Sequence, residues 1–139
     1  MLQSYVIDAS VFIASQKKSE TKNRACLNFF KNISTAQSEV YLPTLAVYEV
    51  VNNLKRHACL GTAALRDIAK TMTESSNVTL IPVDLAMLDR TIGWLDKGLS
   101  LKTADLIYVV CALATGSTLV TLDKAMVKSA RKLIAVKIP

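Results

Sequence analysis

The stretch TADLIYVVCALATGSTLVTLD, residues 103–123, decides the predicted fold. From Ala104 to Thr115 apolar residues occupy every side of a helical projection, which is typical of a buried helix. Gly116 is the kind of residue that ends a helix, and Leu119–Leu122 is then a continuous apolar run of strand length. A buried helix joined to a buried strand indicates a parallel sheet with both faces covered by helices.

The same alternation of strands and helices continues away from this stretch. Strands are predicted at residues 2–7, 40–42, 78–83, 119–122 and 133–138, and helices at residues 9–16, 20–34, 44–58, 62–74, 85–97, 103–115 and 124–131. This order predicts an α/β fold, a three-layer α/β/α sandwich with a central parallel sheet. Because the chain shows no repeat, linker or change in composition, residues 1–139 are expected to form a single domain.

The composition fits a globular chain in a reducing compartment. Of the 139 residues, 51% are hydrophobic and 20% are charged, with 4 Gly and 3 Pro, which excludes a disordered, collagen-like or low-complexity chain. The three cysteines form no C-x-x-C pair, so we expect no disulfide framework or zinc knuckle, and a cytoplasmic location.

Residues 1–10 lack a basic signal-peptide start, and the uncharged stretch 106–122 is shorter than the roughly 20 residues that cross a bilayer. We expect no membrane segment.

Three aspartates directly follow predicted strands, namely Asp8, Asp84 and Asp123. Ligands bind at the carboxyl ends of the strands in α/β sheets, so each of the three is a candidate for chemistry. Aspartate is also a preferred residue at a helix N-terminus, where its side chain accepts a backbone N–H, and each of the three precedes a predicted helix. Spacing alone does not choose between these interpretations.

Asp105 and Glu49 are two further candidate acids. Asp105 is the only charge in the apolar helix, and if Thr103 caps that helix, Asp105 lies in the first turn, where the helix dipole favours an anion. A buried carboxylate is costly unless it is paired or bound to a metal, so both roles stay open. Periodicity places Glu49 opposite the apolar side of the helix at 44–58, which indicates a solvated side chain, although this helix begins at the same sheet edge as Asp8.

The chain resembles the PIN domains, and most of all the VapC ribonuclease toxins of toxin–antitoxin pairs. The segments that carry the resemblance, in the family's order, are YVIDAS at 5–10, LPT at 42–44 with EVVN at 49–52, LKTADLIY at 101–108 and LVTLD at 119–123. Together they span nearly the whole chain. The resemblance implies that Asp8, Glu49, Asp105 and Asp123 form the site, and that Asp84 only starts a helix.

The resemblance implies a metal-dependent endoribonuclease that hydrolyses RNA phosphodiester bonds. The four acids would hold Mg²⁺ or Mn²⁺, hard cations that prefer oxygen ligands, directly or through water. Two carboxylates about 4 Å apart repel by about 4 kcal/mol at an effective dielectric constant near 20, so such a cluster persists only with bound cations or protons. Ser10 and Thr121 are expected to orient the ligands by hydrogen bonds, and Asn53 and Lys102 to contact phosphate.

One region departs from the family pattern. Many PIN domains have a further acid or a histidine, and then an aromatic residue, shortly after the last aspartate, where this chain has Lys124, Ala125 and Met126. A second metal ion would therefore have fewer ligands, which weakens a two-metal mechanism more than it weakens the nuclease assignment.

Charge and resemblance together indicate the partners. When the four site acids are set aside, 17 basic residues stand against 7 acidic ones, and the net charge of the whole chain is +6. Such a surface fits a polyanion, and an aromatic content of 6% argues against base stacking as the main contact. The resemblance implies a folded RNA substrate such as a tRNA or a ribosomal stem-loop, a homodimer, and an antitoxin protein whose tail blocks the acidic pocket.

Other classes of protein find less support in the residues. His57 is the only histidine and lies late in a predicted helix beside Lys55 and Arg56, where it suits the helix end better than a serine triad. The four glycines are dispersed and form no phosphate loop. Two alternatives remain: a PIN-like module that binds RNA or protein without cutting, and an aspartyl-phosphate enzyme, which the absence of a D-x-D pair at Asp8 disfavours.

Overall fold

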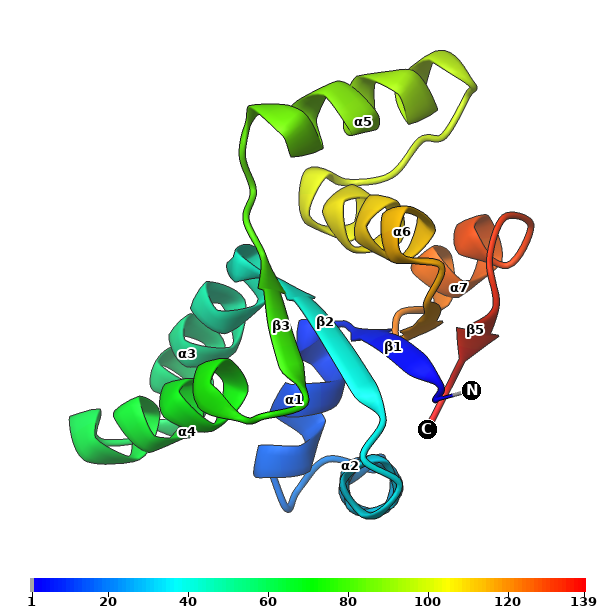
Figure 1. Ribbon diagram of the computed structural model, residues 1–139. Coiled ribbons are helices and arrows are strands. Elements are labelled where there is room, and N and C mark those ends of the chain that lie inside the picture. Colours follow the sequence, from blue (N-terminus) through cyan, green and yellow to red (C-terminus); the bar gives the residue numbers. More distant parts are fainter. Residues whose placement is uncertain (1) are drawn as a thin grey trace.

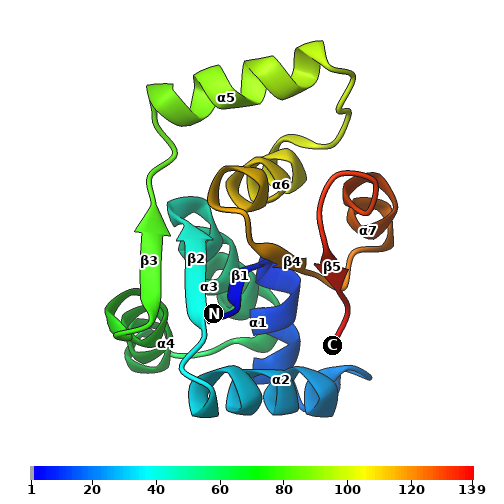
Figure 2. The same cartoon turned by 45° about the vertical axis from the view of Figure 1, so that its right-hand side comes forward.

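Within residues 2–139, which the computed structural model describes, all five predicted strands are present and pair in one parallel sheet. The strands are β1 (Ser4–Ile7), β2 (Glu39–Pro43), β3 (Val78–Ile81), β4 (Thr118–Val120) and β5 (Val136–Lys137). Their order across the sheet is β3-β2-β1-β4-β5 (Figures 1 and 2). Val6 and Ile7 of β1 are fully buried, because this strand is central and has helices over both of its faces.

All seven predicted helices are also present in this part of the chain. They are α1 (Ala9–Gln16), α2 (Asn23–Thr35), α3 (Thr44–Ala58), α4 (Thr62–Glu74), α5 (Leu85–Asp96), α6 (Thr103–Thr115) and α7 (Lys124–Ala130). Crossovers between parallel strands are right-handed, so α1 to α4 cover one face of the sheet and α6 and α7 cover the other (Figure 2). The predicted three-layer α/β/α arrangement is therefore confirmed. None of the helices in residues 2–139 is long and apolar enough to cross a membrane.

Helix α6 fills much of the core on its side of the sheet and lies against β1, β2 and β4. Its buried side chains include Tyr108, Val109 and Val110. Gly116 ends the helix with a φ of +64°, a left-handed conformation that favours glycine, and its N–H donates to the carbonyl of Ala112. The chain then reverses into β4, which brings the first turn of α6 near the carboxyl edge of the sheet.

The element boundaries differ from the predictions by a few residues. Strand β5 has only two residues, because Leu133 and Ile134 bond back to the carbonyl of Ala130 in a turn instead of joining the sheet. The prediction that Thr103 caps α6 is wrong, since Lys102 occupies the N-cap and its side chain makes no capping hydrogen bond. Residue 105 nevertheless lies in the first turn of α6, as predicted.

The strand order creates a topological switch point between β1 and β4. Strand β1 leads into α1 on one face of the sheet, whereas β4 leads into α7 on the other face. The two connections separate at the carboxyl edge, and the crevice that such a separation leaves is the usual ligand site of an α/β sheet. Helix α5 packs on α6 and stands apart from the sheet (Figures 1 and 2).

Candidate active site

Asp8 and Asp123 flank the switch point. Asp8 directly follows β1, and Asp123 lies just beyond β4, its neighbour in the sheet, in which Ile7 and Val120 are paired. The backbone N–H of Asp8 donates to the carbonyl of Val120 at 2.9 Å, which extends the ladder by one residue. The two acids therefore sit at the same edge, on connections that lead to opposite faces.

The Asp8 carboxylate is held by two hydroxyl groups. Ser10 Oγ donates to Asp8 Oδ2 at 2.5 Å, and Thr121 Oγ1 donates to the same oxygen at 2.8 Å. Only 6% of Asp8 is exposed, and burial raises its pKa above the ordinary aspartate value, with a further contribution from the charge of Asp123. The two hydroxyl hydrogen bonds oppose this rise in the pKa.

Of the three aspartates that follow strands, Asp84 and Asp123 cap a helix with their side chains and Asp8 does not. Asp84 Oδ1 accepts the N–H of Met87 at 3.0 Å, so Asp84 caps α5. Asp123 Oδ1 accepts the N–H of Met126 at 3.0 Å and caps α7 in the same way. Asp8 precedes α1 but makes no capping hydrogen bond through its side chain. Its carboxylate is committed to Ser10 and Thr121 instead.

Glu49 is half-buried, and the solvated position that periodicity indicated is wrong. The reason is tertiary: Tyr108 of α6 reaches across to α3, and its hydroxyl donates to Glu49 Oε1 at 2.7 Å. Burial raises the pKa of Glu49, and the charges of Asp8 and Asp105 raise it further, while the hydrogen bond from Tyr108 lowers it. Glu49 thus shares an electrostatic environment with two of the other candidate acids.

Asp105 lies in the first turn of α6 and is partly exposed. Burial raises its pKa, and the charges of Asp123 and Asp8 add to the rise, whereas the nearby Lys102 lowers it. Lys102 itself is exposed at the N-cap of α6. Asp105 therefore belongs to the same group of mutually repelling carboxylates as Asp8, Glu49 and Asp123.

Three of these four acids line one open cavity of about 330 Å³ at the switch point. Its lining consists of Asp8, Ala9, Ser10, Ile13, Glu49, Asn53, Leu122 and Asp123. Asp105 is not part of this lining, but the charges of Asp123 and Asp8 contribute to its raised pKa. Across residues 2–139, no three His, Cys, Asp or Glu side chains are close enough to form a ready-made metal cluster. Asp8, Glu49 and Asp123 therefore line the cavity without converging on a single point.

Two residues near the cavity were not singled out from the sequence. Lys17, at the end of α1, donates from Nζ to Asn53 Oδ1 at 3.0 Å, and no local pattern marks it. Tyr108 does have a signal: it lies three residues after Asp105, so the two share a face of α6, and it carries a hydroxyl in an apolar segment. Burial and the negative charge of Glu49 raise the pKa of Tyr108, which keeps its hydroxyl a donor.

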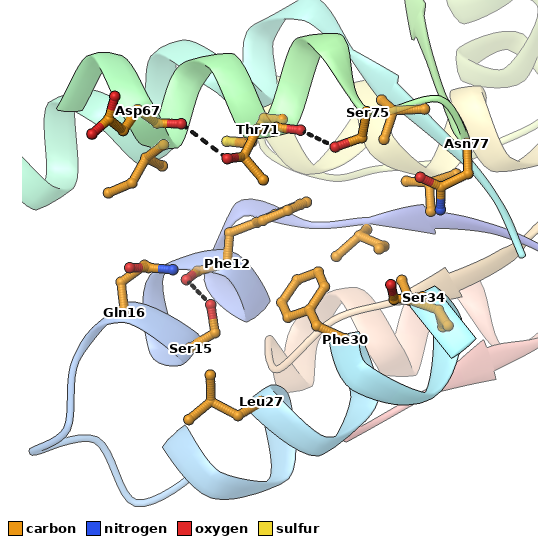
Figure 3. Close-up of a pocket in the computed structure, with 16 residues that line it drawn as sticks. Phe12, Ser15, Gln16, Leu27, Phe30, Ser34, Asp67, Thr71, Ser75 and Asn77 are labelled. Atoms are coloured by element: carbon orange, nitrogen blue, oxygen red, sulfur yellow. Dashed lines mark hydrogen bonds between the residues drawn. The ribbon is translucent and has the colours of Figure 1, made fainter. Parts of the chain in front are cut away.

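A larger cavity of about 410 Å³ lies elsewhere, between α1, α2 and α4 (Figure 3). Apolar side chains such as Phe12, Leu27 and Phe30 line it, and the Phe12 and Phe30 rings are 4.8 Å apart between centroids. Asp67 is the only ionisable residue in its lining. This cavity therefore lacks the paired titratable groups that hydrolytic chemistry needs.

The chain matches the PIN domain family over residues 5–132 and belongs to that family. The resemblance seen in the four sequence segments is thereby confirmed. No curated protein matches the chain closely enough to add a second assignment.

Solved structures with the same fold include a VapC toxin and VapBC complexes. VapC20 of Mycobacterium tuberculosis, described as a sarcin-ricin loop cleaving toxin, has a TM-score of 0.69 at 15% identity, and the match covers 89% of this chain and 93% of that one. VapBC2 of Rickettsia felis bound to a fragment of promoter DNA matches with a TM-score of 0.68 at 12% identity, over 99% of both chains. VapBC-1 of nontypeable Haemophilus influenzae gives 0.69 at 12% identity over 98% of both chains. At such identities the likeness shows the fold.

Proposed function

We propose that this protein is a metal-dependent endoribonuclease and the toxin of a VapBC-type toxin–antitoxin pair. One observation carries the proposal: Asp8, Glu49 and Asp123 line a single cavity, and the charges of Asp8 and Asp123 raise the pKa of Asp105. Burial and mutual repulsion raise the pKa of Asp8, Glu49 and Asp105 together. Natural proteins keep such a costly group of acids mainly where function requires it.

The donor set fits Mg²⁺ or Mn²⁺. All four side chains offer carboxylate oxygens, which these hard cations prefer, and a bound cation would offset the repulsion among them. Three carboxylates on one open cavity suit Mg²⁺, which keeps several of its waters and takes few direct protein ligands. When bound, the cation supplies an activated water and offsets charge on the scissile phosphate.

The remaining residues have supporting roles in this proposal. Ser10 and Thr121 hold Asp8 in one orientation through its Oδ2 atom. Asn53 lies in the cavity lining, and Lys17 donates a hydrogen bond to its side chain. The amide of Asn53 and the ammonium group of Lys17 are therefore the proposed contacts for a substrate phosphate beside the acids. Lys102 is exposed next to Asp105 and offers a further positive charge at the rim. The net charge of +6 on the chain then favours a polyanion such as RNA.

The test is cleavage of labelled tRNA and ribosomal stem-loop RNA in Mg²⁺ or Mn²⁺. We expect cleavage by the wild type, its loss on adding EDTA, and a fall of at least about 100-fold in Asp8→Asn and Asp105→Asn. Asp84→Asn is the matched control, because Asp84 also follows a strand but caps α5 at the outer β3 edge. RNA binding without cleavage in the wild type would favour a non-catalytic module. Cleavage by Asp8→Asn and Asp105→Asn at the wild-type rate would overturn the assigned residues.

We also infer two protein partners, a second copy of the chain and an antitoxin. The neighbouring VapBC structures support the antitoxin. An apolar stripe on α5, formed by Leu85, Leu88, Ile92 and Leu95, is exposed and supports an interface with a second copy. Coexpression with the product of a neighbouring gene that encodes a small DNA-binding protein tests the antitoxin: we expect such a gene to be found, and its product to form a stable complex in which RNA cleavage is blocked. A copurified partner that leaves cleavage unchanged would argue against this role.

A further inference from the structure

Tyr108 is the largest fully buried side chain in the described part of the molecule, yet it ends in a polar atom. It lies in the second turn of α6, among Val109, Val110 and other core residues. A buried hydroxyl needs a hydrogen-bond partner, and the partner here is Glu49 Oε1 of α3, at 2.7 Å. Tyr108 and Glu49 are 59 positions apart in sequence, so this hydrogen bond depends on how α3 and α6 are placed by the fold.

The geometry of a tyrosine makes this hydroxyl a fixed point. The phenol oxygen lies on the axis of the ring, so flipping the ring about its Cβ–Cγ bond does not move the oxygen. Only χ1 displaces it strongly, and helical backbone and close packing restrict χ1. The position of the donor is therefore set by where α6 lies.

Glu49, in contrast, has three side-chain torsions and is only half-buried. Without a partner its carboxylate would sample several rotamers and turn toward water, away from the repulsion of Asp8 and Asp105. The hydrogen bond from Tyr108 opposes this movement. Because Asp105 lies one turn earlier on the same face of α6, one helix carries both a site acid and the donor that restrains another.

We propose that Tyr108 is a positioning residue, which holds the Glu49 carboxylate at the acidic cavity so that a divalent cation meets it already in place. This inference rests on the proposed function, since it assigns a role in the same site. Groups that orient metal-binding side chains typically change metal affinity by about 10–100-fold when they are removed. Tyr108 acts through Glu49 and does not itself contact the substrate.

The experiment measures Mn²⁺ affinity by titration calorimetry on the full chain, without RNA. We expect Tyr108→Phe, which keeps the ring and removes the hydroxyl, to weaken Mn²⁺ binding by about 10–100-fold. Tyr5→Phe is the matched control, because Tyr5 is also buried but its hydroxyl bonds to Gln3, at the opposite end of β1 from Asp8. This control variant is expected to bind Mn²⁺ like the wild type.

A double variant separates positioning from a purely structural role. In a Glu49→Gln background, Tyr108→Phe is expected to cause no further loss of Mn²⁺ affinity, because its effect runs through the Glu49 carboxylate. Additive losses, or a Tyr108→Phe variant that binds Mn²⁺ as tightly as the wild type, would overturn the inference. A wild type that binds no Mn²⁺ would overturn the proposed function itself, and the inference with it.

If Tyr108→Phe does not fold, the wild type still provides a test. Because the hydroxyl proton of Tyr108 is buried and hydrogen-bonded, we expect it to exchange slowly with water, so that NMR can follow it during a Mg²⁺ titration. We expect its resonance to shift as Mg²⁺ saturates the acidic cavity. A resonance that stays unmoved while the backbone signals of Asp8 and Asp123 shift would refute the role of Tyr108.

Discussion

The hydroxyl group of Thr121 forms hydrogen bonds with Asp8 on one side of the crevice and with the backbone of Asp123 on the other. Thr121 Oγ1 donates to Asp8 Oδ2 at 2.8 Å and accepts the backbone N–H of Asp123 at 3.0 Å. Ser10 completes the connection, since its Oγ accepts the N–H of Leu122 at 3.2 Å while donating to Asp8. Side-chain hydrogen bonds therefore connect the start of α1 to the loop after β4, at the point where Asp8 and Asp123 line the cavity.

Thr121→Val is expected to destabilise the protein by about 1–3 kcal/mol, because Asp8 stays buried and loses a donor. In a chain of this size that corresponds to a melting temperature lower by several degrees. Thermal or urea unfolding measures the effect. Thr79→Val, at an exposed position on β3, is the control and should change little. A Thr121→Val protein as stable as the wild type would show that Asp8 does not depend on this hydrogen bond.

Asp105→Asn is expected to stabilise the metal-free protein at pH 7.5. The pKa of Asp105 is raised in the folded state, so its ionised form opposes folding at any pH above that raised value. Below the ordinary aspartate pKa both states are protonated, and the contribution vanishes. The gain in stability of Asp105→Asn over the wild type should thus shrink as the pH falls toward 4. Urea unfolding in EDTA at several pH values measures this gain, and a constant or reversed difference would contradict the proposed repulsion.

Millimolar Mn²⁺ or Mg²⁺ is expected to raise the melting temperature of the wild type. A ligand at 100 times its dissociation constant stabilises the folded state by about 2.7 kcal/mol, and relief of carboxylate repulsion is the physical source here. Thermal unfolding across a metal titration provides the measurement. Asp8→Asn should respond weakly, whereas Asp84→Asn should respond like the wild type. A melting temperature that does not change with metal in the wild type would count against a cation site.

Substitutions on the apolar stripe of α5 are expected to produce monomers. Leu88 and Ile92 are 51% and 54% exposed, and a charge at either position would oppose burial against a second copy. Leu88→Lys and Ile92→Lys should sediment at half the mass of the wild type in analytical ultracentrifugation. Leu133→Lys is the control, an exposed leucine near the C-terminal end. A wild type that is already monomeric at micromolar concentration would contradict the proposed dimer.

The sequence was sufficient for the order and type of the elements because each strand is a continuous apolar run next to a turn or helix signal. The strand ends at Asp8 and Asp123 followed from the same runs, and parallel strands necessarily share an edge. Glu49 was different: helical periodicity describes one helix in isolation, and the half-buried position comes from Tyr108 on another helix. Whether Asp8, Glu49, Asp105 and Asp123 act as the site remains a prediction.

The partners of Glu49 and Asn53 also show where local patterns stop being informative. Tyr108 and Lys17 reach these residues from distant parts of the chain, through contacts that depend on how α1, α3 and α6 pack. The pattern of α6 does predict that Tyr108 shares a face with Asp105. It does not predict which neighbour that face meets.

Helix α6 is buried along most of its length, and this has a consequence for how the molecule tolerates change. A turn of this helix by a single residue, about 100°, would carry Asp105 and Tyr108 away from the cavity together. Substitutions at Cys111 or Ala112, which are buried in the hydrophobic interior, are therefore able to impair the crevice while leaving its own residues intact. Substitutions that change only the packing of apolar side chains in the core can in this way impair the crevice indirectly.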